Sequence, residues 1–290
     1  MTETDKNKFP LEFEAMDSSE FLNKNLSDES AARMAALFIG HGSPMNAIED
    51  NIFARNWREI GESLPRPKAI LSVSAHWETS GTYVTSMPNP PTIHDFGGFP
   101  RELYEIQYPA PGNPVFAAEL SSSGHVKEMG QDNSWGLDHG TWSVLRRMYP
   151  NADIPVVQMS LDYTKPMAYH FGLARQLKSL RNKGVLIMGS GNLVHNLGRI
   201  DWSKRNDEEF GHDWALEAND IFKKHILDGN HKAIEEYSTL GKEVRLAVPT
   251  PDHLIPLLYV HALKEDNDTV SFFNDRAVMG SLTMTSVIIG

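Results

Sequence analysis

Four histidines follow apolar segments or a proline-rich turn, and they are the residues of this sequence best suited to hold a metal ion. They are His41, His76, His195 and His253. Neutral imidazole is the commonest metal ligand in proteins. The chain contains no cysteine, which excludes disulfides, iron–sulfur clusters, cysteine-based zinc sites and thiol nucleophiles. Any bound metal must therefore be held by histidine and carboxylate side chains.

The spacing of these histidines favours a shared site over four unrelated structural roles. A single histidine at a strand end is more often a hydrogen-bonded structural side chain than a ligand. Here three of the four follow apolar segments, and glycines at 40, 42, 189 and 191 would let the backbone approach an ion closely. The fourth, His253, lies in Pro249-Thr-Pro-Asp-His, where two prolines predict a turn and a helix start. The pattern predicts that four imidazoles converge on one metal ion.

Other histidines carry weaker signals. His139, in Asp138-His-Gly140, either points into the same cleft as an acid/base or caps a turn, and the sequence favours neither interpretation. His94 lies in a Gly/Pro-rich loop with two phenylalanines, which is either a lid over the site or, as we favour, an ordinary surface loop. The remaining histidines are interpreted as solvated or packing residues; they are His125, His170, His212, His225, His231 and His261.

The elements that must position these side chains alternate between short apolar runs and amphipathic stretches. The runs predict strands over 35–39, 69–75, 154–161, 184–189 and 281–289. Helices are predicted over 52–63, 115–122, 141–148, 167–180, 207–227 and 251–262, with a shorter one near residue 233. Strands that are apolar on both faces and alternate with helices indicate an α/β fold with a mostly parallel central sheet flanked by helices. The carboxyl edge of such a sheet is where ligands bind.

The sequence predicts a polar N-terminal extension, residues 1–34, and one globular domain, residues 35–290. Asp17 and Ser27 are possible helix caps in the extension. From residue 35 onward there is no repeat, low-complexity tract or Gly/Ser linker, so a single domain is expected.

Composition excludes several classes of partner. The 290 residues include 27 Lys and Arg against 38 Asp and Glu, a formal net charge of -11, and no basic run stands out. Such a chain lacks the basic surface of a nucleic-acid-binding protein. It shows neither an apolar stretch of roughly 18 residues nor an export signal, so we expect no membrane span and a cytoplasmic location. The glycine clusters complete neither a dinucleotide-binding nor a phosphate-binding motif. Neither composition nor motifs predict an oligomeric state.

Six short motifs, taken together and in order, resemble the class III extradiol ring-cleavage dioxygenases, and most closely their 4,5-DOPA extradiol dioxygenase branch. The motifs are His41-Gly-Ser-Pro, Ser74-Ala-His-Trp, Gly136-Leu-Asp-His-Gly, Gly191-Asn-Leu-Val-His-Asn, Pro251-Asp-His and Gly280-Ser-Leu-Thr-Met. The resemblance extends from about residue 37 to the C-terminus.

The resemblance implies one divalent metal ion per chain, non-haem Fe(II) or zinc in its place. By position, His41, His76 and His253 look like ligands, and His195 either completes the shell or acts as an acid/base beside it. His195 and His139 are the candidates for proton transfer, because imidazole exchanges protons near neutral pH. Members of the wider class use two histidines and a glutamate; a histidine in place of the carboxylate suits zinc as well as iron.

The activity implied by the resemblance is the opening of a catechol ring, such as that of L-DOPA, by O2 to a muconic semialdehyde (a product of the 4,5-seco-DOPA type). The partners would be a small catechol and O2. Two alternatives stay open: a zinc-dependent hydrolase, in which a metal-bound water is the nucleophile, and a metal-free binding protein of the same fold. Oxygen uptake would separate the first two, and four intact histidines argue against the third.

Overall fold

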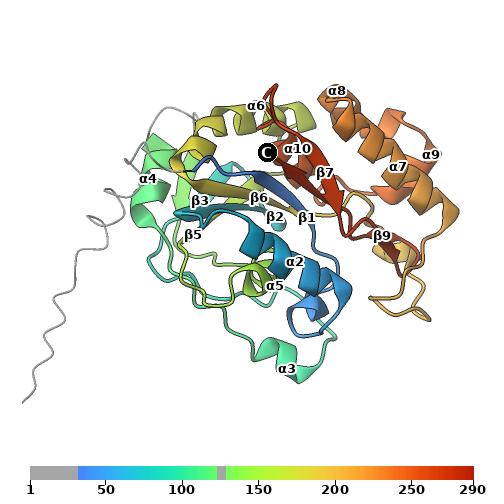
Figure 1. Ribbon diagram of the computed structural model, residues 1–290, viewed down its shortest axis with the longest axis horizontal. Helices are drawn as coiled ribbons and strands as arrows, with labels where there is room; N and C mark the ends of the chain where they lie inside the picture. The colour runs from blue at the N-terminus through green and yellow to red at the C-terminus, as the bar shows by residue number, and fades with distance from the viewer. Residues whose placement is uncertain (1–31, 123–128) are drawn as a thin grey trace, which may run out of the picture.

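An eight-stranded sheet forms the centre of the computed structural model, which describes residues 32–122 and 129–290 (Figure 1). The predicted caps at Asp17 and Ser27, and His125, lie outside the described residues. The strands lie in the order β4-β3-β5-β2-β6-β1-β10-β7. Their bounds are β1 (Ala36–Gly40), β2 (Ala69–Thr79), β3 (Thr82–Thr85), β4 (Met129–Asp132), β5 (Val156–Asp162), β6 (Val185–Gly191), β7 (Val270–Phe273) and β10 (Ser286–Ile289). A separate small hairpin joins β8 (Ala277–Val278) and β9 (Leu282–Thr283).

The middle of the sheet is parallel, as predicted. β5 pairs with β2, β2 with β6, and β6 with β1, all in parallel register. At one edge β10 and β7 run antiparallel, and at the other β3 pairs antiparallel with β5 and parallel with β4. The carboxyl ends of β1, β2 and β6 therefore meet at one edge of the sheet.

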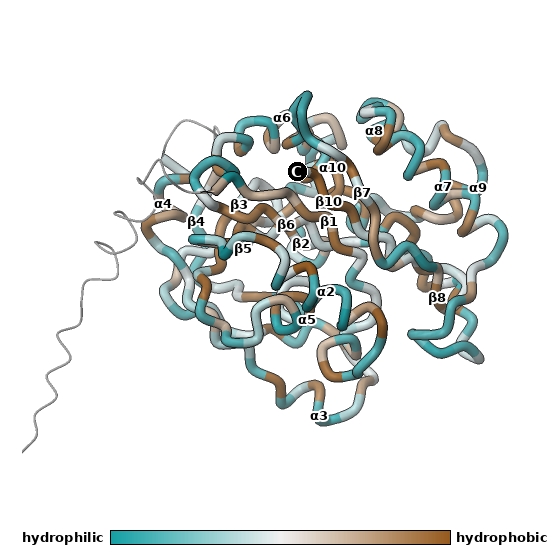
Figure 2. The backbone as a smooth tube through the Cα atoms, viewed as in Figure 1, coloured by the Kyte–Doolittle hydropathy of each residue, from teal (hydrophilic) through white to brown (hydrophobic). Residues whose placement is uncertain are grey.

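Both faces of the central strands are buried, which is why they read as continuous apolar runs. Within β1, Phe38 packs into the hydrophobic cluster on one face, whereas Leu37 and Ile39 pack into the cluster on the other. Figure 2 shows the resulting concentration of apolar residues along the central strands. Successive side chains of a strand point to opposite faces of the sheet, and both sets are buried because helices cover both faces.

Helices cover the two faces of the sheet. In Figure 1, α2 and α5 lie on one side, and α6 and α10 lie on the other. The bounds are α2 (Ile52–Ser63), α3 (Arg101–Tyr104), α4 (Pro114–Ser122), α5 (His139–Met148), α6 (Met167–Gln176), α7 (Asp213–Leu227), α8 (His231–Glu235), α9 (Lys242–Ala247) and α10 (Ile255–His261). Short 3-10 turns are η1 (Pro44–Ala47), η2 (Lys178–Lys183), η3 (Leu197–Arg199) and η4 (Tyr237–Thr239). Within the described residues, none of the helices combines the length and the apolar character that crossing a membrane requires.

Several predicted boundaries are wrong. The helix predicted over 207–227 begins at Asp213, because the residues before it are extended and bridge the β8–β9 hairpin. The helix predicted over 167–180 ends at Gln176 and continues as η2. The tail predicted as one strand over 281–289 divides into β9 and β10. Strands β3, β4 and β7 were not expected, since each is only four residues long.

Candidate metal centre

The carboxyl edge of the parallel strands positions three of the predicted histidines. His41 directly follows β1, and His76 lies within β2, which extends past the predicted end at residue 75. His253 precedes α10 and is held against the end of β6. A Cβ atom at Gly191 would lie 2.1 Å from the carbonyl oxygen of His253, so only glycine allows this approach. The backbone N–H of Asn192 donates to the same carbonyl at 3.0 Å.

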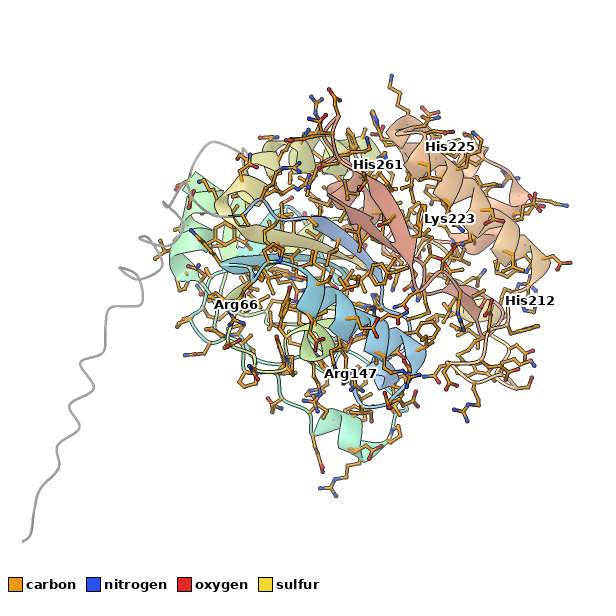
Figure 3. The ribbon with its side chains drawn as sticks, in the orientation of Figure 1. Arg66, Arg147, His212, Lys223, His225 and His261 are labelled. Atoms are coloured by element: carbon orange, nitrogen blue, oxygen red, sulfur yellow. The ribbon has the colours of Figure 1, made fainter. Side chains whose placement is uncertain are left out.

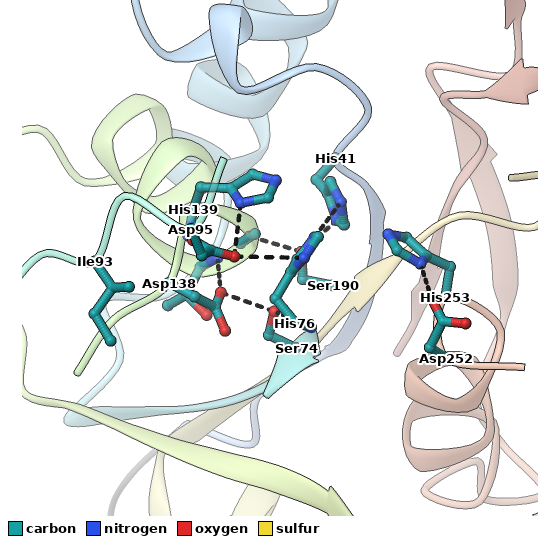
Figure 4. A network of polar contacts seen from close by, with 12 residues as sticks. His41, Ser74, His76, Ile93, Asp95, Asp138, His139, Ser190, Asp252 and His253 are labelled. Atoms are coloured by element: carbon teal, nitrogen blue, oxygen red, sulfur yellow. Dashed lines mark hydrogen bonds and ion pairs between the residues drawn. The ribbon is translucent and has the colours of Figure 1, made fainter. Parts of the chain in front are cut away.

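The three imidazoles converge on one point (Figure 4). One ring nitrogen from each of His41, His76 and His253 lies within 4.8 Å of the other two. The Nε2 atoms of His41 and His76 are 3.1 Å apart. The Nε2 atom of His253 is buried without a hydrogen-bond partner. Three buried nitrogens that face one another, one of them unpaired, are the arrangement expected of ligands to a metal ion.

Hydrogen bonds at the other ring nitrogens orient these ligands. The Ser190 hydroxyl donates to the carbonyl of Gly140 at 2.6 Å, so its oxygen is left to accept from Nδ1 of His41 at 3.0 Å. That bond places the proton on Nδ1 and leaves the Nε2 lone pair of His41 free. Nδ1 of His253 is bonded to the carboxylate of Asp252 in the same way. Such outer partners set the tautomer of a histidine ligand.

The electrostatic setting favours the neutral form of His41 and His76. Burial, followed by the neighbouring imidazoles, lowers the pKa of His41 and of His76 well below the usual value. Burial raises the pKa of Asp252, but the hydrogen bond and charge of His253 outweigh it and lower that pKa to about 2. Two neutral imidazoles, with a third that has a carboxylate behind it, match the needs of a divalent cation.

His195 lies beside the three-histidine group rather than within it. Its ring stacks on that of His253, with centroids 3.5 Å apart and an interplanar angle of 8°. A second possible ligand group combines His195 with Asp252 and His253. Burial, followed by the charge of His253, lowers the pKa of His195 to about 3, so its imidazole is neutral at physiological pH.

His139 points into the same site. It is the first residue of α5, which Asp138 caps by accepting from the N–H of Thr141 at 3.1 Å. The ring centroid of His139 lies 4.0 Å from that of His76. Asp95 accepts from the backbone N–H of His139 at 2.9 Å and bonds its Nδ1 at 3.0 Å. Asp138, and not His139, caps the start of α5. The imidazole of His139 therefore lies among the other histidines, as the first of the two interpretations of this residue expects.

Asp95 is a functional residue that the sequence motifs do not reveal. The loop before α3 draws attention to His94, yet His94 is turned away and bonds the carbonyl of Ile106 at 3.0 Å. The next residue, Asp95, faces the site, where one carboxylate oxygen lies 3.0 Å from Nδ1 of His139 and 3.4 Å from Nδ1 of His76. The feature of the sequence that could have indicated Asp95 is a carboxylate in a glycine-rich loop that also contains aromatic residues.

The other histidines of the described chain lie elsewhere. His170 and His261 are buried and bond Tyr259 and the carbonyl of Ile226, and His231 stacks on Phe171. Figure 3 labels His212, His225 and His261 on the α7–α10 side of the molecule. These residues fit the packing and solvated roles expected of them.

The imidazoles open into a cavity of about 640 Å³. Five histidines line it, namely the three converging ones, His139 and His195. Its walls are apolar and partly aromatic, with side chains that include Met45, Phe96, Phe99, Ile200, Met279 and Leu282. A volume in this range and apolar walls around a few polar groups suit a small organic ligand. Phe96 and Phe99 come from the loop that carries His94 and Asp95, so this loop lines the cavity and is not an ordinary surface loop.

Comparison with known proteins supplies the family. Residues 35–278 match the model of the catalytic LigB subunit of aromatic ring-opening dioxygenase. The chain is 45% identical to a 4,5-DOPA dioxygenase extradiol of Escherichia coli K12, covering 90% of this chain and 96% of the relative. It is 38% identical to a protein of the same name from Beta vulgaris, covering 86% and 96%. A crystal structure of an uncharacterized Escherichia coli K12 protein superimposes with a TM-score of 0.76 at 40% identity, over 89% of this chain and all of that one (100%). The chain thus belongs to the LigB family of extradiol aromatic ring-opening dioxygenases and is an enzyme of that kind.

Proposed function

We propose that the protein opens the ring of a catechol such as L-DOPA with O2, giving a muconic semialdehyde of the 4,5-seco-DOPA type. The observation that carries the proposal is the convergence of three imidazoles at the end of an aromatic-walled cavity. The relatives named 4,5-DOPA dioxygenase extradiol support the choice of substrate.

We assign one divalent metal ion per chain to His41, His76 and His253. The donor set fits such an ion, because one ring nitrogen of each histidine converges on the other two and, within the described residues, Nε2 of His253 has no hydrogen-bond partner. Imidazole ligands suit both iron and zinc, and ring opening by O2 favours Fe(II) as the working metal. When bound, the ion would hold the catechol oxygens and favour their deprotonated form.

The side chains around the ion would move protons and orient the substrate. The Asp95 carboxylate holds the Nδ1 proton of His139, which leaves Nε2 of His139 able to accept a catechol proton and return it later. The loop that carries Phe96 and Phe99 would pack against the ring and exclude water.

His195 would serve either as a fourth ligand or as an acid/base. Substituting His195→Ala should reduce ring cleavage far more than catechol binding. Metal analysis of the same variant separates the two roles, because a lost ligand lowers the metal content whereas a lost proton donor does not. Unchanged turnover with L-DOPA and Fe(II) would refute both roles.

The direct test is elemental analysis of freshly purified protein, then an oxygen-electrode assay with a catechol panel after anaerobic iron loading. We expect oxygen uptake together with the absorbance of a ring-opened product. A protein that holds zinc, takes up no oxygen with any catechol and hydrolyses an ester would instead be a hydrolase. The His225→Ala variant, whose substitution on α7 lies outside the cavity lining, should behave as wild type.

We also propose the division into an extension, residues 1–34, and a catalytic domain, residues 35–290, which the family match from residue 35 supports. A cytoplasmic location stays a prediction from the sequence. A truncated protein that begins at Arg33 tests the domain boundary: it should stay active and keep the contacts of Arg33 and Met34 with Asp268 and Arg181.

A further inference from the structure

Two charged residues of the cavity lining have no part in the histidine cluster. Glu49 lies just beyond η1, and Lys204 lies in the loop between η3 and α7. Both side chains are half-buried. Within the described residues, neither forms a hydrogen bond or ion pair with any of the five lining histidines. Their charges face the ligand space from two segments distant in the sequence.

The carboxylate of Glu49 has a neutral amide as its hydrogen-bond partner; Arg205, whose pKa is raised mainly by Asp207 and also by Glu49, forms its ion pair with Asp207. Nδ2 of Asn206 donates to Oε2 of Glu49 at 2.9 Å and so links the two segments across the cavity. Arg147, labelled in Figure 3, donates to the backbone carbonyl of Glu49 at 2.6 Å. The backbone N–H of Glu49 donates to the backbone carbonyl of Met45 at 2.9 Å. A neutral amide partner orients the carboxylate and leaves its charge available.

Lys204 is also pre-positioned. Its Nζ atom lies 2.8 Å from a carboxylate oxygen of Glu208 and 5.0 Å from the ring centroid of Phe210. An ammonium group has three donors, so the contact with Glu208 leaves others for a ligand. In the described lining, Lys204 is the one lysine, and no arginine accompanies it.

The remaining carboxylate of the lining is already engaged. Both oxygens of Asp95 accept from His139, one from the backbone N–H and one from Nδ1. A cationic group on a ligand would therefore find its partner in Glu49, and an anionic group in Lys204. One charge of each sign in an otherwise apolar and histidine-lined cavity complements a zwitterion.

We propose that Glu49 and Lys204 recognise the α-amino acid group of the substrate, Glu49 binding its ammonium and Lys204 its carboxylate. This inference rests on the proposed ring opening and assigns the two residues that would select a zwitterionic catechol amino acid over catechols that lack one or both charges. A catechol amine would leave Lys204 without its partner, a catechol acid would leave Glu49 without its partner, and a neutral catechol would leave both.

The test compares four substrates that differ by single charges: L-DOPA, dopamine, dihydrocaffeate and methylcatechol. We expect Lys204→Met to raise KM about tenfold for L-DOPA and dihydrocaffeate but not for dopamine, the size expected of one charge-assisted hydrogen bond. Glu49→Gln should raise KM similarly for L-DOPA and dopamine but not for dihydrocaffeate. Neither variant should change kcat or the KM of methylcatechol. Anaerobic calorimetry should show the same pattern in the dissociation constants.

Matched controls are Lys232→Met and Glu62→Gln, which remove the same charges at exposed positions outside the cavity and should leave all four KM values unchanged. Equal effects of the lining variants on every substrate, or no effect on any, would overturn the inference. If the wild type opens no catechol at all, the proposed function fails, and the calorimetric pattern still decides whether the two charges recognise the amino acid group.

Discussion

The two ends of the central parallel strands hold their polar side chains in opposite ways. At the amino end, Arg181 is completely buried within η2, which directly precedes β6. Its guanidinium donates to the carbonyls of Met34, Leu263 and Ile289 and to both carboxylate oxygens of Asp268. Arg33 adds a second ion pair to Asp268 at 2.6 Å. Every buried charge there has partners within the chain.

At the carboxyl end, one ring nitrogen of each of the three converging histidines faces the other two and has no partner elsewhere in the described residues. Nε2 of His253 has no partner, and those of His41 and His76 face each other. A buried polar group without a partner destabilises the fold, whereas satisfied groups stabilise it. The amino end therefore ties together segments from both ends of the domain, and the carboxyl end keeps its nitrogens free for a ligand.

The largest effect that separates the two ends should come from the metal ligands. In His76→Ala, we expect metal retention to be lost and ring cleavage to fall roughly 10⁴-fold or more, since a catalytic metal supplies several kcal/mol of barrier lowering. The free energy of unfolding of the metal-free protein should not fall. Elemental analysis, oxygen uptake and urea unfolding measure the three quantities. A variant that keeps both metal and turnover would remove His76 from the ligand set.

His139 should affect turnover without affecting the metal. His139→Gln is expected to lower kcat by about 10² to 10⁴, the usual contribution of a general acid/base, with unchanged metal content. Asp95→Asn should reproduce part of this loss, because the amide no longer fixes the Nδ1 proton. Steady-state kinetics with metal analysis tests both variants. Equal activity in wild type and His139→Gln would contradict the role.

Arg181 should affect stability without affecting the chemistry. Arg181→Met leaves Asp268 buried with fewer partners and should lower the free energy of unfolding by about 3–5 kcal/mol, measured by urea denaturation. The matched control is Arg66→Met, in an ion pair with Asp153 whose side chains are 60% and 49% exposed. It should change stability by less than about 1 kcal/mol. A similar loss in both variants would contradict the comparison.

The smallest effect concerns two buried histidines away from both ends. Burial lowers the pKa of His170 and of His261 to about 4. Above pH 6.5 neither the folded nor the unfolded state protonates them; between pH 6.5 and 4 only the unfolded state does. Stability should therefore fall with falling pH, by up to about 3 kcal/mol for each histidine. Urea unfolding of His170→Asn should show a flatter pH dependence than wild type, and His225→Asn should not.

Much of the fold and the site follows from local sequence patterns. Apolar runs that end in glycine and histidine predict both the parallel strands and the edge where His41 and His76 meet, because the carboxyl ends of such strands lie side by side. The parallel order of β5, β2, β6 and β1 confirms that reasoning. The ordered motifs also identify the family without any coordinates.

The partners of those histidines depend on long-range contacts that no local pattern contains. Asp95 reaches His139 across 44 residues, and Asn206 reaches Glu49 across 157, through loops without periodic patterns. Long-range contacts also decide the position of His195 beside the three converging histidines and the start of α7 at Asp213 instead of the predicted residue 207. Residue types and strand ends determined that histidines would gather at one edge. Only the packing of loops onto that edge decided which atoms converge, which tautomers they carry and which charges face the substrate, because these depend on distances between segments far apart in the chain.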